Sequence, residues 1–105
     1  MSGPPRLLIV DDEPLARERL AALVRESGVA TVVAQAANGI EALAAVATQQ
    51  PDVVLLDIRM PGMDGLEAAR HLAALPAPPA VVFTTAFGDH ALAAFESNAV
   101  AYLLK

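Results

Sequence analysis

Cysteine and tryptophan are absent from the chain, and its aromatic side chains are three phenylalanines and one tyrosine. The lack of cysteine excludes disulfides, thiol catalysis and thiolate zinc sites, and it is compatible with a reducing cytoplasm, where we expect the protein to act. Basic residues are scarce as well, with seven Lys and Arg against twelve Asp and Glu and a net charge of −5. Because nucleic-acid binding needs clustered basic side chains, we expect no nucleic-acid contact from this domain.

Long apolar runs are also missing, although 55% of the residues are hydrophobic. The longest, such as Ala99 to Leu104, fall far short of the roughly 20 residues that a membrane-spanning helix needs. No signal-peptide pattern is visible at the start. We therefore expect a soluble protein without membrane contact, and the length of 105 residues predicts one domain over residues 1–105.

Short apolar runs alternate with longer segments of helical spacing, and this alternation predicts the fold class. Runs rich in Val, Leu and Ile predict five strands, at Leu7–Val10, Thr31–Ala36, Val53–Leu56, Ala80–Thr84 and Val100–Leu104. Continuous apolar strands joined by helices indicate an α/β fold with a parallel sheet that is covered on both faces.

Capping and turn residues indicate where the helices begin and end. Pro14 suits a first helical turn, Asn38 and Asp64 each precede a glutamate at capping-box spacing, and Asp89 can cap a fourth helix. Helix ends are predicted at Gly28, Pro51 and the prolines between positions 76 and 79.

Polar side chains stand where the predicted strands end, which is where open α/β sheets bind their ligands. They are Asp11, Asp12 and Glu13 after the first strand, Asp57 after the third, Thr84 and Thr85 at the fourth, and Lys105 after the fifth. Neighbouring carboxylates repel one another, and a hard divalent cation, Mg²⁺ first, is the usual remedy. A cation beside a carboxylate, a hydroxyl and a lysine predicts phosphoryl transfer, with one carboxylate as the nucleophile.

Simpler explanations stay open for single residues. Asp11 and Asp12 could serve as helix caps, Thr85 could reflect strand propensity, and Lys105 could be a solvated strand end. Asp57 has no capping task at the end of a strand expected to be buried. The joint occurrence of these residues at successive strand ends is what favours a function.

Four other residues are assigned no chemical role. His71 and His90 lie in helical stretches away from the strand ends and are interpreted as surface residues, because a metal site rarely uses a lone histidine. Met60 and Met63 flank a Pro-Gly pair and are expected in a loop that covers the site.

The chain resembles the receiver domain of two-component response regulators over essentially its whole length. The matching segments are Leu8–Glu13, Leu55–Gly65, Thr85–Ala86 and Tyr102–Lys105. The second of them, an aspartate followed at a fixed distance by Met-Pro-Gly-Met-Asp-Gly, is the most specific. The resemblance implies a flavodoxin-like, doubly wound sheet of five parallel strands in the order 2-1-3-4-5.

Carried over to matching positions, the resemblance implies that Asp57 accepts a phosphoryl group from a histidine kinase. Asp11, Asp12, Asp57 and the Arg59 carbonyl would hold Mg²⁺, with Mn²⁺ as the alternative ion. Lys105 would pair with the phosphoryl oxygens.

The resemblance also implies a switch. Thr85 would bond one phosphoryl oxygen, the backbone of Arg59 and Ala86 would contact others, and the movement of Thr85 would free a pocket for Tyr102. The chain would then be a phosphorylation-activated signalling domain. It would be no enzyme beyond catalysing its own phosphoryl transfer and dephosphorylation.

The start of the chain, from Asp12 to Leu20, and the stretch Phe87–Tyr102 resemble receivers of LytTR-type transcription regulators. That subgroup implies an output DNA-binding domain in the parent chain and a role in transcription regulation. The sequence stops at Lys105, so we expect a receiver truncated before its fifth helix. The apolar surface beside the sheet would then favour a homo-oligomer.

Three other classes of protein fit the sequence less well. A haloacid-dehalogenase-like phosphatase needs a second acid two residues after the first, and Arg59 stands there. A receiver-shaped interaction module would be expected to lack an acid or the lysine, and a flavodoxin would need a hydroxyl-rich loop where Asp11–Glu13 stands.

Overall fold

The computed structural model describes residues 3–85 and 101–104 and, for Thr85 and residues 101–104, the backbone alone. Eight elements follow one another along these residues: β1 (Arg6–Val10), α1 (Pro14–Ser27), β2 (Thr31–Ala36), α2 (Gly39–Gln49), β3 (Val53–Asp57), α3 (Gly65–Ala73), β4 (Ala80–Thr85) and β5 (Ala101–Leu104). The predicted strands are confirmed to within one residue at either end. The predicted fourth helix and its cap Asp89 lie outside the described residues.

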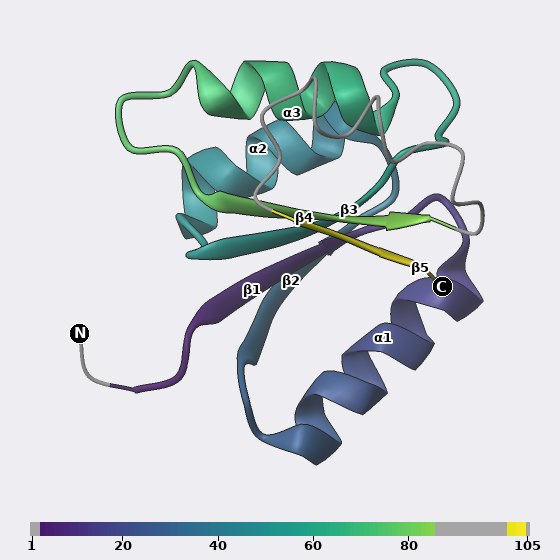
Figure 1. The fold of residues 1–105 in the computed structure, drawn as a ribbon, viewed down its shortest axis with the longest axis vertical. Coiled ribbons are helices and arrows are strands. Elements are labelled where there is room, and N and C mark those ends of the chain that lie inside the picture. The colour runs from purple at the N-terminus through teal and green to yellow at the C-terminus, as the bar shows by residue number, and fades with distance from the viewer. Residues whose placement is uncertain (1–2, 86–100, 105) are drawn as a thin grey trace.

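All strand pairs are parallel, and the sheet has the order β2-β1-β3-β4-β5 (Figure 1). The predicted flavodoxin-like topology is therefore confirmed. β1 and β3 lie at the centre of the sheet because the chain crosses from β2, on one side of β1, to β3 on the other. Strand order reverses between these two strands, which is where such sheets bind their ligands.

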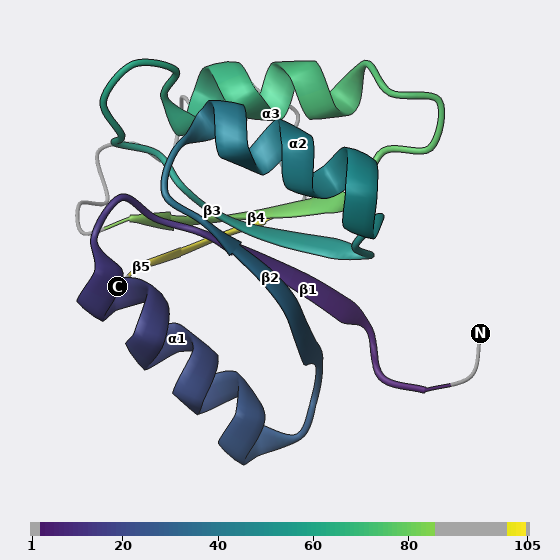
Figure 2. The same ribbon diagram turned by 180° about the vertical axis from the view of Figure 1, so that it is seen from behind.

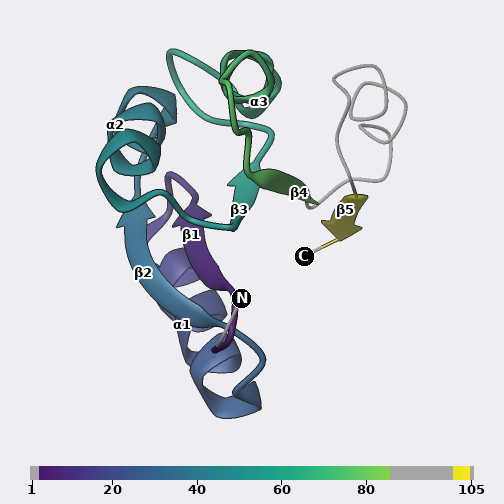
Figure 3. The ribbon, with the colours of Figure 1, turned by 90° about the vertical axis from the view of Figure 1, so that its left-hand side faces the viewer.

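The helices of residues 3–85 cover the two faces of the sheet unequally. α1 lies on one face and α2 and α3 lie on the other, as the opposite views of Figures 1 and 2 and the end view of Figure 3 show. On the α2/α3 side, alternate residues of β1, β3 and β4 such as Leu8, Leu56 and Phe83 are completely buried. The α1 side holds a smaller cluster of Leu7, Ile9 and Ala21. No helix within the described residues is long and apolar enough to cross a membrane.

The helix ends follow the sequence signals. Pro14 opens α1, and Gly28 ends it in the left-handed conformation with φ of 71°. α2 begins at the predicted capping box, where the Glu41 N–H donates to Asn38 Oδ1 over 2.8 Å. The Glu41 carboxylate accepts from the N–H of Ala37, one residue before the cap, over 2.9 Å.

Asn38→Ala is expected to lower the free energy of unfolding by about 1 kcal/mol, because the first turn of α2 loses its side-chain acceptor. Urea denaturation followed by far-UV circular dichroism measures the change. The exposed Gln49 at the other end of α2 provides the control, and Gln49→Ala should stay within about 0.5 kcal/mol of wild type. Equal stability of the two variants would contradict the capping role.

Candidate functional site

Two acidic residues lie side by side at the carboxyl ends of the central strands. β1 pairs with β3 up to Val10 and Leu56, so Asp11 and Asp57, the next residue of each strand path, are brought together. The Asp11 N–H donates to the Ala36 carbonyl of β2 over 3.1 Å, which fixes the end of β1 against its other neighbour. Backbone hydrogen bonding thus places these two carboxylates next to each other, independently of any ligand.

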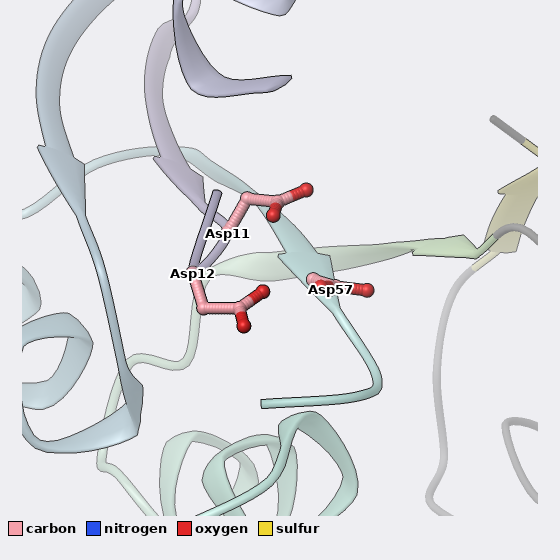
Figure 4. Close-up of side chains that lie close together, drawn as sticks. All are labelled: Asp11, Asp12 and Asp57. Atoms are coloured by element: carbon pink, nitrogen blue, oxygen red, sulfur yellow. The ribbon is translucent and has the colours of Figure 1, made fainter. Parts of the chain in front are cut away.

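Asp12 completes a cluster of three acids. One carboxylate oxygen of each of Asp11, Asp12 and Asp57 lies within 4.8 Å of the others. Asp11 is 0% and Asp57 is 5% exposed, whereas Asp12 is exposed. Figure 4 shows the three side chains pointing in the same direction. The cluster therefore has a buried base and one member that faces solvent.

The chemistry of this donor set fits a small, hard divalent cation. Like charges at this separation repel, and the repulsion grows as water is excluded from Asp11 and Asp57. Carboxylate oxygens are the ligands that Mg²⁺ and Mn²⁺ take in proteins, and Mg²⁺ usually keeps several waters, which the exposed side of Asp12 would accommodate. The residues present therefore suit the ion that the sequence implies.

Asp11 is held through its N–H, its Oδ1 and its carbonyl oxygen. Besides its N–H bond to β2, its Oδ1 accepts from the Glu13 N–H over 3.0 Å. Its carbonyl oxygen accepts from Arg17 Nη1 over 2.7 Å. Sequence reasoning missed Arg17, although one signal was available. α1 has no acidic residue in its first turn, and a cation near a helix N-terminus is electrostatically unfavourable unless something nearby compensates it.

Gly65, the first residue of α3, presses against the back of Asp57. Its N–H donates to the Ile58 carbonyl over 2.8 Å. A Cβ atom at this position would overlap the Asp57 carbonyl oxygen and would lie only 2.8 Å from Asp57 C and Ile58 Cα. The sequence motif contained this glycine, but nothing in its spacing indicated contact with the strand end.

The remaining predicted residues are distributed around the cluster. Arg59 is exposed two residues beyond Asp57. Thr84 pairs with Asp57 across the sheet and is 1% exposed, and Thr85 ends β4. Ala86, Lys105 and the side chain of Tyr102 lie outside the described residues.

The methionine prediction needs a correction. Met60 is 7% exposed and belongs to the core on the α2/α3 side, so it does not cover the site as expected. In the loop between β3 and α3, this side chain packs among the residues of that core. Met63 is half-buried against Gly39. His71 is on the surface as predicted, and His90 lies outside the described residues.

A groove of about 630 Å³ opens beside Asp12. The start of α2 and the loop after β3 form its walls, with Asn38, Ile40, Pro61 and Met63 among the lining residues. The acid cluster is therefore approachable from its Asp12 side.

Comparisons with known proteins agree with this geometry. The sequence pattern described as the response regulator receiver domain matches residues 7–105. The positive alginate biosynthesis regulatory protein of Pseudomonas aeruginosa is 56% identical over 100 residues, which cover 94% of this chain and 40% of that protein. The transcriptional regulatory protein BtsR of Escherichia coli K12 is 45% identical over 95% of this chain and 41% of its own length. The chain thus spans about two fifths of these curated relatives.

Solved structures give the same picture. The signal receiver domain of the response regulator NarL from Mycobacterium tuberculosis superposes with a TM-score of 0.90 at 34% identity, covering 98% of this chain and 85% of that one. A LuxR-family response regulator from Aurantimonas superposes with a TM-score of 0.91 at 33% identity, covering 98% of this chain and 75% of that one.

Proposed function

We propose, for a chain that belongs to the response regulator receiver domain family, that Asp57 is the phosphoacceptor and that Asp11 and Asp12 hold the Mg²⁺ it needs. The family makes the chain a phosphorylation-activated switch that relays its state to an output domain. The observation that carries the residue assignment is the cluster of three carboxylates within 4.8 Å at the strand ends.

Asp57 is suited to act as the nucleophile because the sheet holds it in place. It is the last residue of β3, a strand with a parallel neighbour on each side, and the first residue of α3 stands directly behind its backbone. One of its carboxylate oxygens would attack the phosphorus of a phosphohistidine. The phosphorus–nitrogen bond would break as the new phosphorus–oxygen bond forms, leaving an acyl phosphate on Asp57 and a neutral imidazole once a proton is taken up. Bound Mg²⁺ supplies positive charge that offsets the carboxylates and the incoming phosphoryl group.

The other site residues keep the roles that the family pattern implies. The Arg59 carbonyl would complete the metal ligands, and the backbone N–H groups of Arg59 and Ala86 would contact the phosphoryl oxygens. Lys105 would neutralise charge on the transferred group. Thr85 would bond a phosphoryl oxygen, and its movement would open space for Tyr102.

Phosphorylation by a small donor is expected to require Mg²⁺, and this tests the proposed function. The chain incubated with acetyl phosphate and Mg²⁺ should gain the mass of one phosphoryl group by intact mass spectrometry. The same mixture with EDTA should leave the mass unchanged, because an anionic donor then meets uncompensated carboxylates. Mn²⁺ should restore labelling. Equal labelling in EDTA would contradict the metal role of the acid cluster.

The parent protein's partners follow from the same proposal. We infer that a histidine kinase supplies the phosphoryl group in the cytoplasm and that an output DNA-binding domain reads the state for transcription regulation. BtsR is a transcriptional regulatory protein and one solved relative is a LuxR-family regulator, so the LytTR subgroup stays a prediction. Homo-oligomerisation also stays a prediction. We propose no turnover of a separate substrate.

A further inference from the structure

Arg17, the fourth residue of α1, reaches back to the end of β1. Its Nη1 donates to the Asp11 carbonyl oxygen over 2.7 Å, across six residues of sequence, and this contact is partly shielded from solvent. A charged donor at this distance forms one of the stronger kinds of hydrogen bond in a protein. The contact spans the turn that carries Asp11 and Asp12.

The bond fixes the orientation of one particular peptide group. The Asp11 carbonyl and the Asp12 N–H belong to the same planar unit, so holding the carbonyl oxygen also holds the plane from which the Asp12 Cα projects. Asp11 is independently fixed through its own N–H and its Oδ1. Asp12 is exposed. Among the described residues, no hydrogen bond like that of Arg17 holds the Asp12 side chain in place.

The position of Arg17 is electrostatically unfavourable for the helix itself. The N-terminal end of α1 carries partial positive charge, and an arginine there is destabilising unless it finds a compensating group. The carbonyl of Asp11 and the neighbouring acid cluster supply that compensation. A cation held here acts on the acid cluster in two opposite ways. The charge of Arg17 weakens the binding of Mg²⁺ to the acids. The hydrogen bond of Arg17 orders the turn whose acids would bind Mg²⁺.

We propose that Arg17 is a positioning residue for the metal ligand Asp12, and that its ordering effect outweighs its charge. The inference rests on the proposed role of the acid cluster as a Mg²⁺ site. Arg17 would act indirectly, because its hydrogen bond goes to the Asp11 backbone. It holds the Asp11–Asp12 peptide in the orientation that aims the Asp12 carboxylate toward Asp11 and Asp57.

The sign of the change in Mg²⁺ affinity separates the two effects. Arg17→Met keeps the unbranched stem of the side chain but removes the guanidinium with its charge and donors, and it is expected to weaken Mg²⁺ binding about tenfold, as loss of an outer partner of a metal ligand commonly does. Isothermal titration of Mg²⁺ into the unphosphorylated chain measures this without any reaction. The exposed Arg19 on the same helix gives a control with the same change of net charge, and Arg19→Met should change affinity by less than about twofold.

Two further measurements distinguish positioning from general damage. Arg17→Lys should recover most of the affinity, because the ammonium can donate to the same carbonyl. Without Mg²⁺, amide exchange at Asp12 and Glu13 should rise in Arg17→Met while exchange in β3 stays unchanged. If Arg17→Met is too unstable to titrate, the polar Arg17→Gln, whose amide is too short to reach the carbonyl, should also bind Mg²⁺ more weakly.

Wild-type or tighter Mg²⁺ binding in Arg17→Met, or in Arg17→Gln if that variant is used, would overturn the proposal and leave Arg17 as a simple counter-charge. That result would not affect the proposed function, which depends on Mg²⁺ binding and phosphorylation of the wild-type chain. Failure of the wild-type chain to bind Mg²⁺ would refute both.

Discussion

Alanine in place of Asp57 is expected to abolish the phosphoryl adduct that the wild-type chain forms with acetyl phosphate and Mg²⁺. The nucleophilic oxygen is gone, and neither Asp11, which is completely buried, nor Asp12, which is exposed, stands at the end of β3. Mg²⁺ binding should also weaken by at least about tenfold, because loss of a direct ligand costs no less than loss of an outer partner. Intact mass and calorimetric titration measure the two effects separately.

Asp64 provides a matched control within the same sequence motif. It is an exposed carboxylate whose Oδ1 accepts from the Glu67 N–H over 2.8 Å at the start of α3. Asp64→Ala should lose about 1 kcal/mol of stability through the missing cap and still form the adduct. An adduct of undiminished yield on Asp57→Ala would place the phosphoacceptor elsewhere and refute the proposed site.

Gly65→Ala is expected to destabilise the fold by about 3 kcal/mol, whereas glycine to alanine in a helix ordinarily stabilises by up to about 1 kcal/mol. The added methyl group would overlap the backbone of Asp57 and Ile58, which belongs to the central strand and cannot move as a flexible side chain could. Because the displaced atoms carry the phosphoacceptor, the rate of phosphorylation should fall in whatever fraction remains folded. Urea denaturation followed by circular dichroism is suitable, since the chain has no tryptophan.

Gly28→Ala is a control for Gly65→Ala, because it introduces backbone strain without a steric clash. Gly28 has φ of +71°, and nothing lies within 4 Å of a Cβ built on it, so Gly28→Ala should lose about 1 kcal/mol through the left-handed conformation alone. Its phosphorylation rate should be that of wild type. If Gly65→Ala were as stable as wild type, α3 would have to start further from Asp57 than the structure places it.

The fold was predictable because its signals are local. The apolar runs at Leu7–Val10 and Val53–Leu56 and the capping residue Asn38 each specify their element within a few positions. Strand order was available only from the resemblance, because single-strand patterns contain no information about neighbours. The loop after β3 shows where local reasoning fails. Met60 is a loop residue by sequence, and its burial depends on how the whole loop turns toward α3.

The candidate site divides in the same way. Asp11, Asp12 and Asp57 were predicted because the carboxyl ends of parallel strands meet at one edge, and the structure brings the three together. Arg17 and Gly65 were not predicted, because each acts through a contact between separate elements. The Arg17 side chain bonds the end of β1, and the Gly65 backbone lies close to the backbone at the end of β3. The spacing of residues along a sequence does not indicate how close two separate elements come in space.

The unequal covering of the sheet determines where the described part of the domain opens most easily. Among the residues whose side chains the structure describes, fourteen buried hydrophobic residues form the cluster on the α2/α3 side, against three on the α1 side. Local unfolding follows the element with least buried contact, so α1 should detach in a sub-global opening while the larger cluster stays intact. Arg17 belongs to α1, and the acids it helps to place follow β1. A ligand that binds those acids only when α1 is packed on the sheet would therefore stabilise this packed state and make the opening of α1 rarer.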